Sequence, residues 1–421
     1  MSFFRRRIII RAFTLRRDMG WAILLKKALE RLGADVFIAC SRNYVWAVQA
    51  WKPHVVIVNT VGQIGYSAKY APTAEIVFWP AEGGEPWIHS DANLLSRSPE
   101  LFTKISAVFA WGELGLEHFA RAFPGSVRGK VFKFGNPRLD LIKFFSAPKR
   151  TQTVIGFATR FNSICHADGR PTLYTLTNPK NLGSVITQAK NFVGFYELVQ
   201  LILRETDYVI SVRPHPLESP TYYEQYIQRL SPSRILVDRS YDFLLWLANQ
   251  SVLVTPTTSA NIEAYIANAT TVNLDSLSGT SSVMSDFNEH ASFLGERFAI
   301  SLSDHASVLD VLKRSIDGSR KPMDRDPMMD EFLKRAHDWP RDYSSILRGA
   351  EKVIEIALEN NGPPLLWPTL PLLQLKDQYD VRHLSRADPL HLESNYSAKY
   401  HKIGKVYDEI FSRMLLSQRP I

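Results

Sequence analysis

Short apolar runs alternate with longer amphipathic stretches along most of the chain. The run IIIRAF at residues 8–13 precedes Met19–Leu32, where apolar residues recur three and four positions apart, the spacing of one helix face. Gly33 then supplies a helix stop. Because strands buried on both faces are continuously apolar, short Val-, Ile- and Phe-rich runs between helices predict a parallel sheet with helices on both faces, an α/β fold.

This pattern occurs twice, on either side of the polar segment FFSAPKRTQ. After the first strand, the predicted strands before that segment are DVFIAC, HVVIVNT, EIVFWP, SAVFAWG and VFKFGN. Those after it are TVIGFAT, DYVISV, RILVD, SVLVTP and TVNLD, with helices predicted at Phe192–Glu205, Tyr241–Gln250 and Ala260–Asn268. We therefore predict two doubly wound domains, at residues 1–148 and 149–360, with ligands bound at the carboxyl ends of their strands.

Residues 361–421 form a predicted C-terminal extension that differs from the rest of the chain. The proline-broken stretch GPPLLWPTLPLL leads into a segment with a single apolar stripe. The stripe consists of Ile403, Val406, Tyr407, Ile410, Phe411 and Met414. Two interpretations fit this pattern: a closing helix that packs on the body, or an amphipathic surface that makes peripheral contact with an anionic inner membrane.

The composition is that of a two-domain protein in a reducing compartment. The 421 residues, 45% of them hydrophobic, suffice for two cores. Cys40 and Cys165 are the two cysteines, and they lack disulfide-framework or metal-ligand spacing. No apolar run approaches a signal peptide or the roughly 20 residues of a spanning helix, which predicts a cytoplasmic location. The net charge of +8 indicates an anionic partner, but no zinc-finger or RNA-binding signature points to nucleic acid.

The segment SVRPHPLESP places Arg213 and His215 at the end of a predicted strand. Its prolines can continue neither a sheet nor a helix, so both side chains are held at a fixed turn. The turn PTTSAN follows another predicted strand and offers the hydroxyls of Thr257, Thr258 and Ser259 at a helix start. Such a turn is a ready anion site, although the same residues serve elsewhere as ordinary helix caps.

Two further segments of the second domain fit the same ligand. Glu263 lies one turn into the helix, where it can accept hydrogen bonds from a ribose. The segment IGFATRFN brings Arg160 and Asn162 to the end of the domain's first strand. Together these residues predict a pocket for a phosphate-linked donor.

At this point the chain resembles the GT-B glycosyltransferases that use CMP-activated sugars, such as bacterial sialyltransferases and the transferases of Kdo, an eight-carbon keto-acid sugar. Most of residues 5–275 is similar to the bacterial surface carbohydrate biosynthesis protein group, through PAEGG, FAWGE, FGNPRLDL, RPHP and TTSANIEA. The resemblance implies two Rossmann-like domains that face a central cleft. It implies that His215 contacts the donor phosphate and protonates the leaving group, while Thr258 and Ser259 hold the same phosphate.

The families also share an acidic motif of two carboxylates followed by glycine. In VFWPAEGGEPW, Ala81 replaces the first carboxylate and Glu82 remains. The resemblance implies that Glu82 is the general base of an inverting enzyme or the nucleophile of a retaining one. Asp168 in CHADGR, also followed by glycine, is the rival carboxylate.

The acceptor side is defined less sharply. Three arginines lie after the first strand: Arg11, Arg16 and Arg17. They would either face an anionic acceptor or be solvated surface charges. Asn136 of FGNPRLDL is a further acceptor-side candidate.

No Asp-x-Asp occurs in the donor-domain turns, so we expect no metal and no cofactor. A CMP donor has one phosphate and needs less help from a cation. No G-x-G-x-x-G follows the first strand, which argues against a dinucleotide oxidoreductase.

The sequence therefore predicts a glycosyltransferase that moves a Kdo-like or sialic-acid-like sugar from a CMP donor to a surface polysaccharide or to a lipid-linked acceptor. Two alternatives remain open. One is a CDP-glycerol or CDP-ribitol phosphotransferase of the teichoic-acid kind, which shares an R-x-HP element. The other is a non-catalytic sugar-nucleotide-binding scaffold in capsule assembly, which Ala81 favours.

Overall fold

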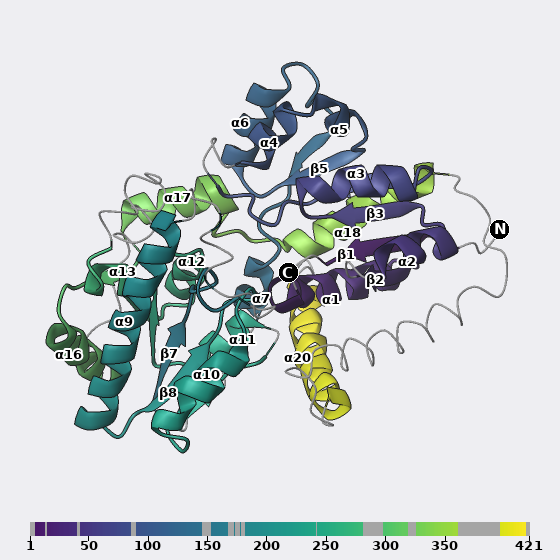
Figure 1. Cartoon of the computed structure of the whole chain (residues 1–421). Coiled ribbons are helices and arrows are strands. Elements are labelled where there is room, and N and C mark those ends of the chain that lie inside the picture. The colour runs from purple at the N-terminus through teal and green to yellow at the C-terminus, as the bar shows by residue number, and fades with distance from the viewer. Residues whose placement is uncertain are drawn as a thin grey trace. The chain divides into compact units, whose positions relative to one another are not determined.

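The computed structural model describes residues 5–12, 15–39, 43–85, 90–144, 153–166, 172, 177, 182–240, 242–280, 298–318, 326–360 and 396–417. The chain forms two compact units, one of Met1–Phe145 with Asp330–Ile421 and one of Ser146–Met329. Each unit contains a six-stranded parallel sheet with helices packed beside it (Figure 1). The predicted α/β class with two Rossmann-like domains is thus confirmed.

The sheet of the first unit has the strand order β2-β1-β3-β4-β5-β6. Its strands are β1 (Arg7–Arg11), β2 (Asp35–Ala39), β3 (Val55–Val58), β4 (Glu75–Phe78), β5 (Ala107–Ala110) and β6 (Val131–Lys133). The helices between them are α1 (Leu15–Arg31), α2 (Tyr44–Trp51), α3 (Val61–Tyr70), α4 (Asp91–Ser96), α5 (Pro99–Thr103), α6 (Glu113–Ala122) and α7 (Leu139–Phe144). Tyr44 of α2 and Ile64 of α3 pack with Ile9 and Val56 on one face of the sheet.

The sheet of the second unit has the order β12-β11-β10-β7-β8-β9. Its strands are β7 (Val154–Ala158), β8 (Val209–Arg213), β9 (Ile235–Val237), β10 (Val252–Thr255), β11 (Thr270–Asn273) and β12 (Ile300–Ser301). Its helices are α9 (Leu182–Glu205), α10 (Pro220–Tyr226), α11 (Phe243–Leu247), α12 (Ala260–Ile266), α13 (Leu274–Leu277) and α16 (His305–Ile316). The predicted strands are all present, whereas the two-residue β12 is too short to leave an apolar pattern.

Helices cover the second sheet on both faces. Phe195 and Leu198 of α9 and Leu312 of α16 share one core with the sheet. On the side of α11, a Cβ on Gly156 of β7 would lie 2.7 Å from a Gln250 side-chain carbon and 3.0 Å from the Trp246 ring. Glycine at this position therefore lets the end of α11 approach the strand closely.

The chain returns to the first unit after Met329, whereas the sequence pattern predicted a second domain of residues 149–360. The returning segment contains α17 (Pro327–His337), within which the unit boundary falls, and α18 (Ser345–Glu359), which packs on α1 and on β3 and β4. Arg341 forms a buried ion pair with Asp140, at 2.6 Å, and Asp140 also accepts hydrogen bonds from Ser344 Oγ at 2.7 Å and Ile346 N at 2.9 Å. Residues 330–360 are therefore fixed to the first unit by the aspartate of FGNPRLDL.

The apolar stripe of the C-terminal segment is used for packing. Helix α20 (Tyr396–Leu416) contacts α1 and α7, and its Tyr407, Ile410 and Met414 are buried. Lys27 of α1 pairs with Asp408 at 2.5 Å. These contacts favour the closing helix over a membrane-facing surface. Among the described residues, no helix combines the length and apolar character that crossing a bilayer requires.

Candidate functional site

In the second unit, the candidate donor residues follow three neighbouring strands. β7 lies between β10 and β8, and both flanking strands run parallel to it. The chain leaves β7 at Thr159 and Arg160, β8 at Pro214 and His215, and β10 at the Pro256–Ser259 turn. The chain order reverses between β7 and β10, and in open α/β sheets ligands bind at such a switch point.

A buried glutamate that the sequence reading missed holds two of these loops together. The Glu218 carboxylate accepts hydrogen bonds from Thr159 Oγ1 and Tyr223 Oη, both at 2.6 Å, and from His215 N at 3.3 Å. It also accepts one from the backbone N–H of Phe161. Burial raises the pKa of Glu218 to about 7, and the donated hydrogen bonds oppose that shift. Glu218 thus ties the loop after β7 to the loop after β8.

The His215 side chain is half-buried and has a defined orientation. Its Nδ1 accepts a hydrogen bond from the backbone N–H of Leu217 at 3.2 Å. In the neutral imidazole the proton is then on Nε2. In this form Nε2 is the hydrogen-bond donor of the ring, and the turn between the two prolines fixes its position.

Arg213, a predicted phosphate ligand, has its charge paired inside the unit. Its side chain is 7% exposed, forms an ion pair with Asp238 and donates a hydrogen bond to Ser240 Oγ at 2.8 Å. Its guanidinium also lies 5.8 Å from the centre of the Trp246 ring. Arg213 stabilises the end of β8 from inside the unit, and we remove it from the candidate phosphate ligands.

The hydroxyl turn after β10 contains one buried and two more accessible hydroxyl residues. Thr257 is buried, and its backbone N–H donates to Asp275 Oδ2 at 2.6 Å. Thr258 Oγ1 accepts a hydrogen bond from Ala260 N at 3.1 Å, while Ser259 is exposed and its side chain makes no capping bond. Thr258 therefore caps the helix, and Ser259 is the hydroxyl that local structure does not use.

The remaining donor-side candidates differ in accessibility. Arg160 is exposed and donates to the backbone oxygen of Thr257 at 3.1 Å, so it connects the loops on both sides of the switch point. Asn162 is half-buried two residues later. Glu263 is only 5% exposed, which places its carboxyl inside the unit rather than on an open surface. Asp168 lies outside the described residues.

In the first unit, Glu82 lies in the turn that follows β4. It is 38% exposed and accepts a hydrogen bond from Arg17 Nη1 at 2.8 Å. Arg17 also pairs with the buried carboxylate of Asp18 at 3.0 Å. Arg17, a predicted acceptor-side residue, therefore orients Glu82 and shares its charge with two carboxylates.

The other acceptor-side candidates are also explained by local structure. The Arg11 guanidinium is buried and lies 4.2 Å from the centre of the Tyr44 ring. Asn136 is buried, with Nδ2 3.1 Å from His337 Nδ1 and Oδ1 accepting from Arg138 N at 3.0 Å, so it holds the returning chain. The side chain of Arg16 is not among those described. None of these described contacts points to an anionic acceptor.

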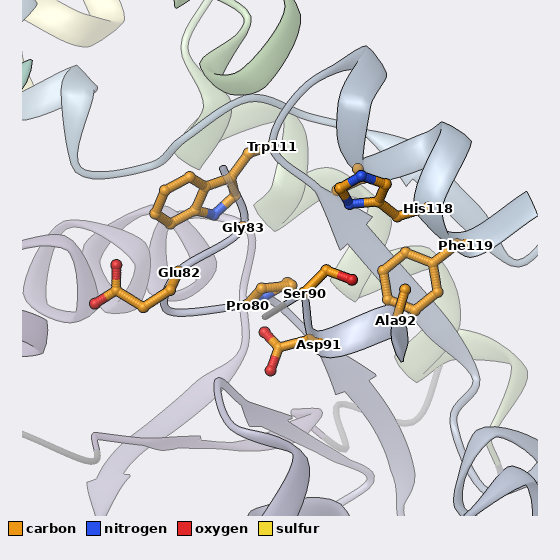
Figure 2. A pocket seen from close by; sticks show the side chains of 11 residues that line it. Pro80, Glu82, Gly83, Ser90, Asp91, Ala92, Trp111, His118 and Phe119 are labelled. Carbon is orange, nitrogen blue, oxygen red and sulfur yellow. The ribbon is translucent and has the colours of Figure 1, made fainter. Parts of the chain in front are cut away.

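Glu82 lines a small pocket (Figure 2). It is enclosed by the turn after β4, the start of α4, the end of β5 and one face of α6, and its lining includes Asp91, Trp111 and His118. Burial raises the pKa of Asp91 to about 8, and the charges of Glu85 and Glu82 add to that shift while Arg17 opposes it. Burial lowers the pKa of His118. The pocket lining thus includes the Glu82 carboxyl, which Arg17 orients, and the Asp91 carboxyl, whose pKa is raised.

Sequence reasoning did not find Asp91. The available signal was the segment HSDANLL, in which Ser90 caps α4 by accepting from Asn93 N at 3.2 Å and Asp91 opens the helix. That pattern is typical of any helix start. Its proximity to Glu82 arises only from the fold.

Among the described residues, no group of three or more His, Cys, Asp or Glu side chains could hold a metal ion.

Comparison with solved structures shows the fold of the chain. The Methanocaldococcus jannaschii UDP-GlcNAc 2-epimerase in complex with UDP-GlcNAc and UDP is similar with a TM-score of 0.50 and 14% identity, over 83% of this chain and 99% of that one. A variant of the wall teichoic acid polymerase TagF is similar with a TM-score of 0.51 and 10% identity, over 84% and 90%. No protein-family model matches the chain, and no curated protein matches it by sequence. The chain has a GT-B-like fold built from two Rossmann-like domains.

Proposed function

We propose that the protein is a metal-independent glycosyltransferase that moves a Kdo-like or sialic-acid-like sugar from a CMP donor to a cell-surface polysaccharide or glycolipid. One observation carries the proposal: in the second unit, His215 and the Thr258–Ser259 hydroxyls follow the two strands that flank β7. A fixed proton donor and hydroxyls at the carboxyl ends of neighbouring strands suit a single phosphate that must leave with negative charge.

In this proposal the second unit binds the donor. Ser259 and Thr258 donate hydrogen bonds to the donor phosphate, and the exposed guanidinium of Arg160 supplies the positive charge that Arg213 does not provide. The bond between the anomeric carbon and the phosphate oxygen breaks, and CMP leaves with the electron pair. His215 acts as the imidazolium, in which Nδ1 no longer accepts from Leu217 N, and donates its Nε2 proton toward that phosphate oxygen.

The first unit supplies the carboxylate of the reaction. In an inverting enzyme Glu82 takes the proton of the acceptor hydroxyl as the acceptor oxygen attacks the anomeric carbon. In a retaining enzyme Glu82 first attacks that carbon and forms a glycosyl ester; the deprotonated acceptor oxygen then displaces the Glu82 carboxylate. Arg17 holds Glu82 in place in both cases. Asp168 remains the second candidate for this role.

Turnover with a panel of donors tests the proposal. The protein is incubated with CMP-Kdo, CMP-sialic acid, CDP-glycerol and UDP-GlcNAc in EDTA, and products are analysed by mass spectrometry. We expect release of CMP, and transfer when a saccharide acceptor is added. UDP-GlcNAc turnover would instead support epimerase chemistry, and CDP-glycerol turnover would support the phosphotransferase; nucleotide binding without turnover of any donor would support a scaffold.

A further inference from the structure

The first-unit segments PAEGG, FAWGE and FGNPRLDL each place a glycine against the returning chain. A Cβ added to any of these three glycines would lie only 2.2 to 2.8 Å from an atom of residues 335–345, closer than a real side chain can approach. The three pairs are Gly84 with the His337 imidazole, Gly112 with the Arg335 carbonyl oxygen, and Gly135 with Ser345 Oγ. All of these residues belong to the first unit, so the three segments form a packing surface for the returning chain.

The turn that carries Glu82 lies between two rings. A Cβ on Gly83 would lie 2.7 to 2.9 Å from Trp111 ring atoms, and one on Gly84 would lie 2.8 and 2.9 Å from His337 Nε2 and Cε1. Figure 2 shows Gly83 and Glu82 beside the Trp111 ring. The centres of the two rings are 5.4 Å apart. Neither glycine has a positive φ, so glycine is needed at both positions because the rings occupy the space.

The His337 ring has a fixed orientation and tautomer. His337 is 4% exposed. Asn136 Oδ1 accepts a hydrogen bond from Arg138 N at 3.0 Å, so it is Asn136 Nδ2 that lies 3.1 Å from His337 Nδ1. Because an amide nitrogen only donates, Nδ1 accepts this bond and the hydrogen of the neutral ring is on Nε2. The Nε2 edge, which faces Gly84, is therefore held against the turn.

We propose that His337 is a positioning residue for Glu82, because its ring sets the position of the turn after β4. The inference rests on the proposed function, in which Glu82 is the base or nucleophile. Arg17 holds the end of the Glu82 side chain through the 2.8 Å hydrogen bond, whereas His337 supports the backbone of the turn. Both are needed, since a carboxylate must lie within hydrogen-bond reach of the proton it takes, and a misplacement of about 1 Å can reduce the rate roughly 100-fold.

A size exchange between positions 84 and 337 tests the inference. Gly84→Ala adds the methyl group that collides with the ring, and His337→Ala removes the ring. We expect each single variant to lower kcat for transfer about 10- to 100-fold, with CMP affinity unchanged because the proposed donor residues belong to the other unit. In the His337→Ala background, Gly84→Ala should lower kcat no further, which is the non-additivity of two residues in contact.

His54→Ala is the matched control. His54 is also buried in the first unit, and its Nδ1 accepts a hydrogen bond from Arg7 N at 3.0 Å, but it precedes β3, at the end of the sheet opposite the turn. Its replacement should lower the free energy of unfolding and leave kcat per folded molecule unchanged. His337→Asn keeps an acceptor for Asn136, so it should retain more stability than His337→Ala and still show the loss of kcat.

A second measurement requires no turnover. Glu82→Cys places a thiol on the turn, and its alkylation by iodoacetamide is followed by mass spectrometry of the peptide that carries position 82. We expect Gly84→Ala to change the alkylation rate about threefold or more when His337 is present, since thiol reactivity depends on its surroundings, and to leave that rate unchanged in the His337→Ala background.

The two measurements separate the inference from the proposed function. A protein that turns over no donor contradicts the proposed function, while the alkylation rates still report whether His337 positions the turn. The inference is overturned if Gly84→Ala changes kcat or alkylation equally in both backgrounds, or if His337→Ala keeps the wild-type kcat as His54→Ala does.

Discussion

The two units place carboxylates beside the carboxyl ends of similar parallel sheets but surround them differently. In the second unit, Glu218 and Asp275 are buried and accept hydrogen bonds from the backbone of the loops that carry the candidate residues. In the first unit, Glu82 is partly exposed, and burial raises the pKa of Asp91, with a further contribution from the charges of Glu85 and Glu82. The carboxylates of the second unit fix the geometry of its loops, whereas in the first unit Glu82 lies partly exposed at a pocket next to a carboxyl with a raised pKa, and perturbed groups of this kind gather at functional sites.

The strongest test of this comparison is Glu82→Gln, which keeps the shape of the side chain and removes its charge. We expect transfer to fall by roughly 10³-fold or more while CMP affinity is retained, because a base or nucleophile is lost and the proposed donor residues belong to the other unit. Steady-state rates and calorimetry with CMP measure the two effects. Intact-mass analysis with donor alone distinguishes the roles, since only a nucleophile gives a sugar adduct.

Glu113→Gln is the control, because Glu113 is an exposed carboxylate of the same unit, outside the pocket lining. Its rate should match the wild type. Near-normal transfer by Glu82→Gln would show that the essential carboxylate lies elsewhere, and Asp168 would be the next residue to replace.

His215→Ala should reduce turnover by roughly 10² to 10⁴, the range for a lost general acid. Arg213→Met sharpens the test, because that residue comes from the same segment but forms an internal ion pair with Asp238. Arg213→Met should lower the free energy of unfolding and leave CMP affinity per folded molecule unchanged. Thermal unfolding and steady-state kinetics on the same preparations separate an effect on stability from an effect on turnover. If His215→Ala loses stability but keeps its turnover rate, His215 takes no part in the reaction.

The buried carboxylate of the second unit predicts a pH dependence of stability. The pKa of Glu218 in the folded state is about 7, above the ordinary value of 4.5, so its contribution is fully present below pH 4.5 and is lost as the pH rises through 7. The shift corresponds to about 3 kcal/mol at most, an order-of-magnitude figure. Because a glutamine at this position cannot titrate, the difference in the free energy of unfolding between wild type and Glu218→Gln should be smaller at about pH 8 than at about pH 5. Denaturant unfolding at both pH values measures this difference. An equal difference at both pH values would contradict the raised pKa.

Much of the fold was predictable because strands buried on both faces leave continuous apolar runs in the sequence. The sequence did not reveal contacts between residues that are far apart along the chain. Arg213 was predicted to bind phosphate because its ion-pair partner, Asp238, lies 25 positions away and could not be identified from the sequence. In the same way, the local pattern around Asp140 did not indicate its contacts with residues 201 to 206 positions later. Glu218 stood inside the segment that drew attention to His215, yet only its burial distinguishes it from a surface glutamate. Local pattern identifies elements, while pairing and desolvation depend on the folded chain.

The smallest effects concern the hydroxyl turn, where the structure separates two neighbouring residues. Thr258 Oγ1 caps α12, whereas the Ser259 side chain does not. Ser259→Ala should therefore weaken CMP binding by about 1 kcal/mol, roughly fivefold, with the free energy of unfolding unchanged. Thr258→Val should weaken CMP binding and also lose about 1 kcal/mol of stability, because the bond to Ala260 N is removed. Calorimetry with CMP and denaturant unfolding measure both quantities, and Thr257→Val, at a buried site, serves as a third comparison. If CMP affinity is the same in the wild type and in the Thr258 and Ser259 variants, the turn is only the start of a helix, and the donor phosphate binds elsewhere.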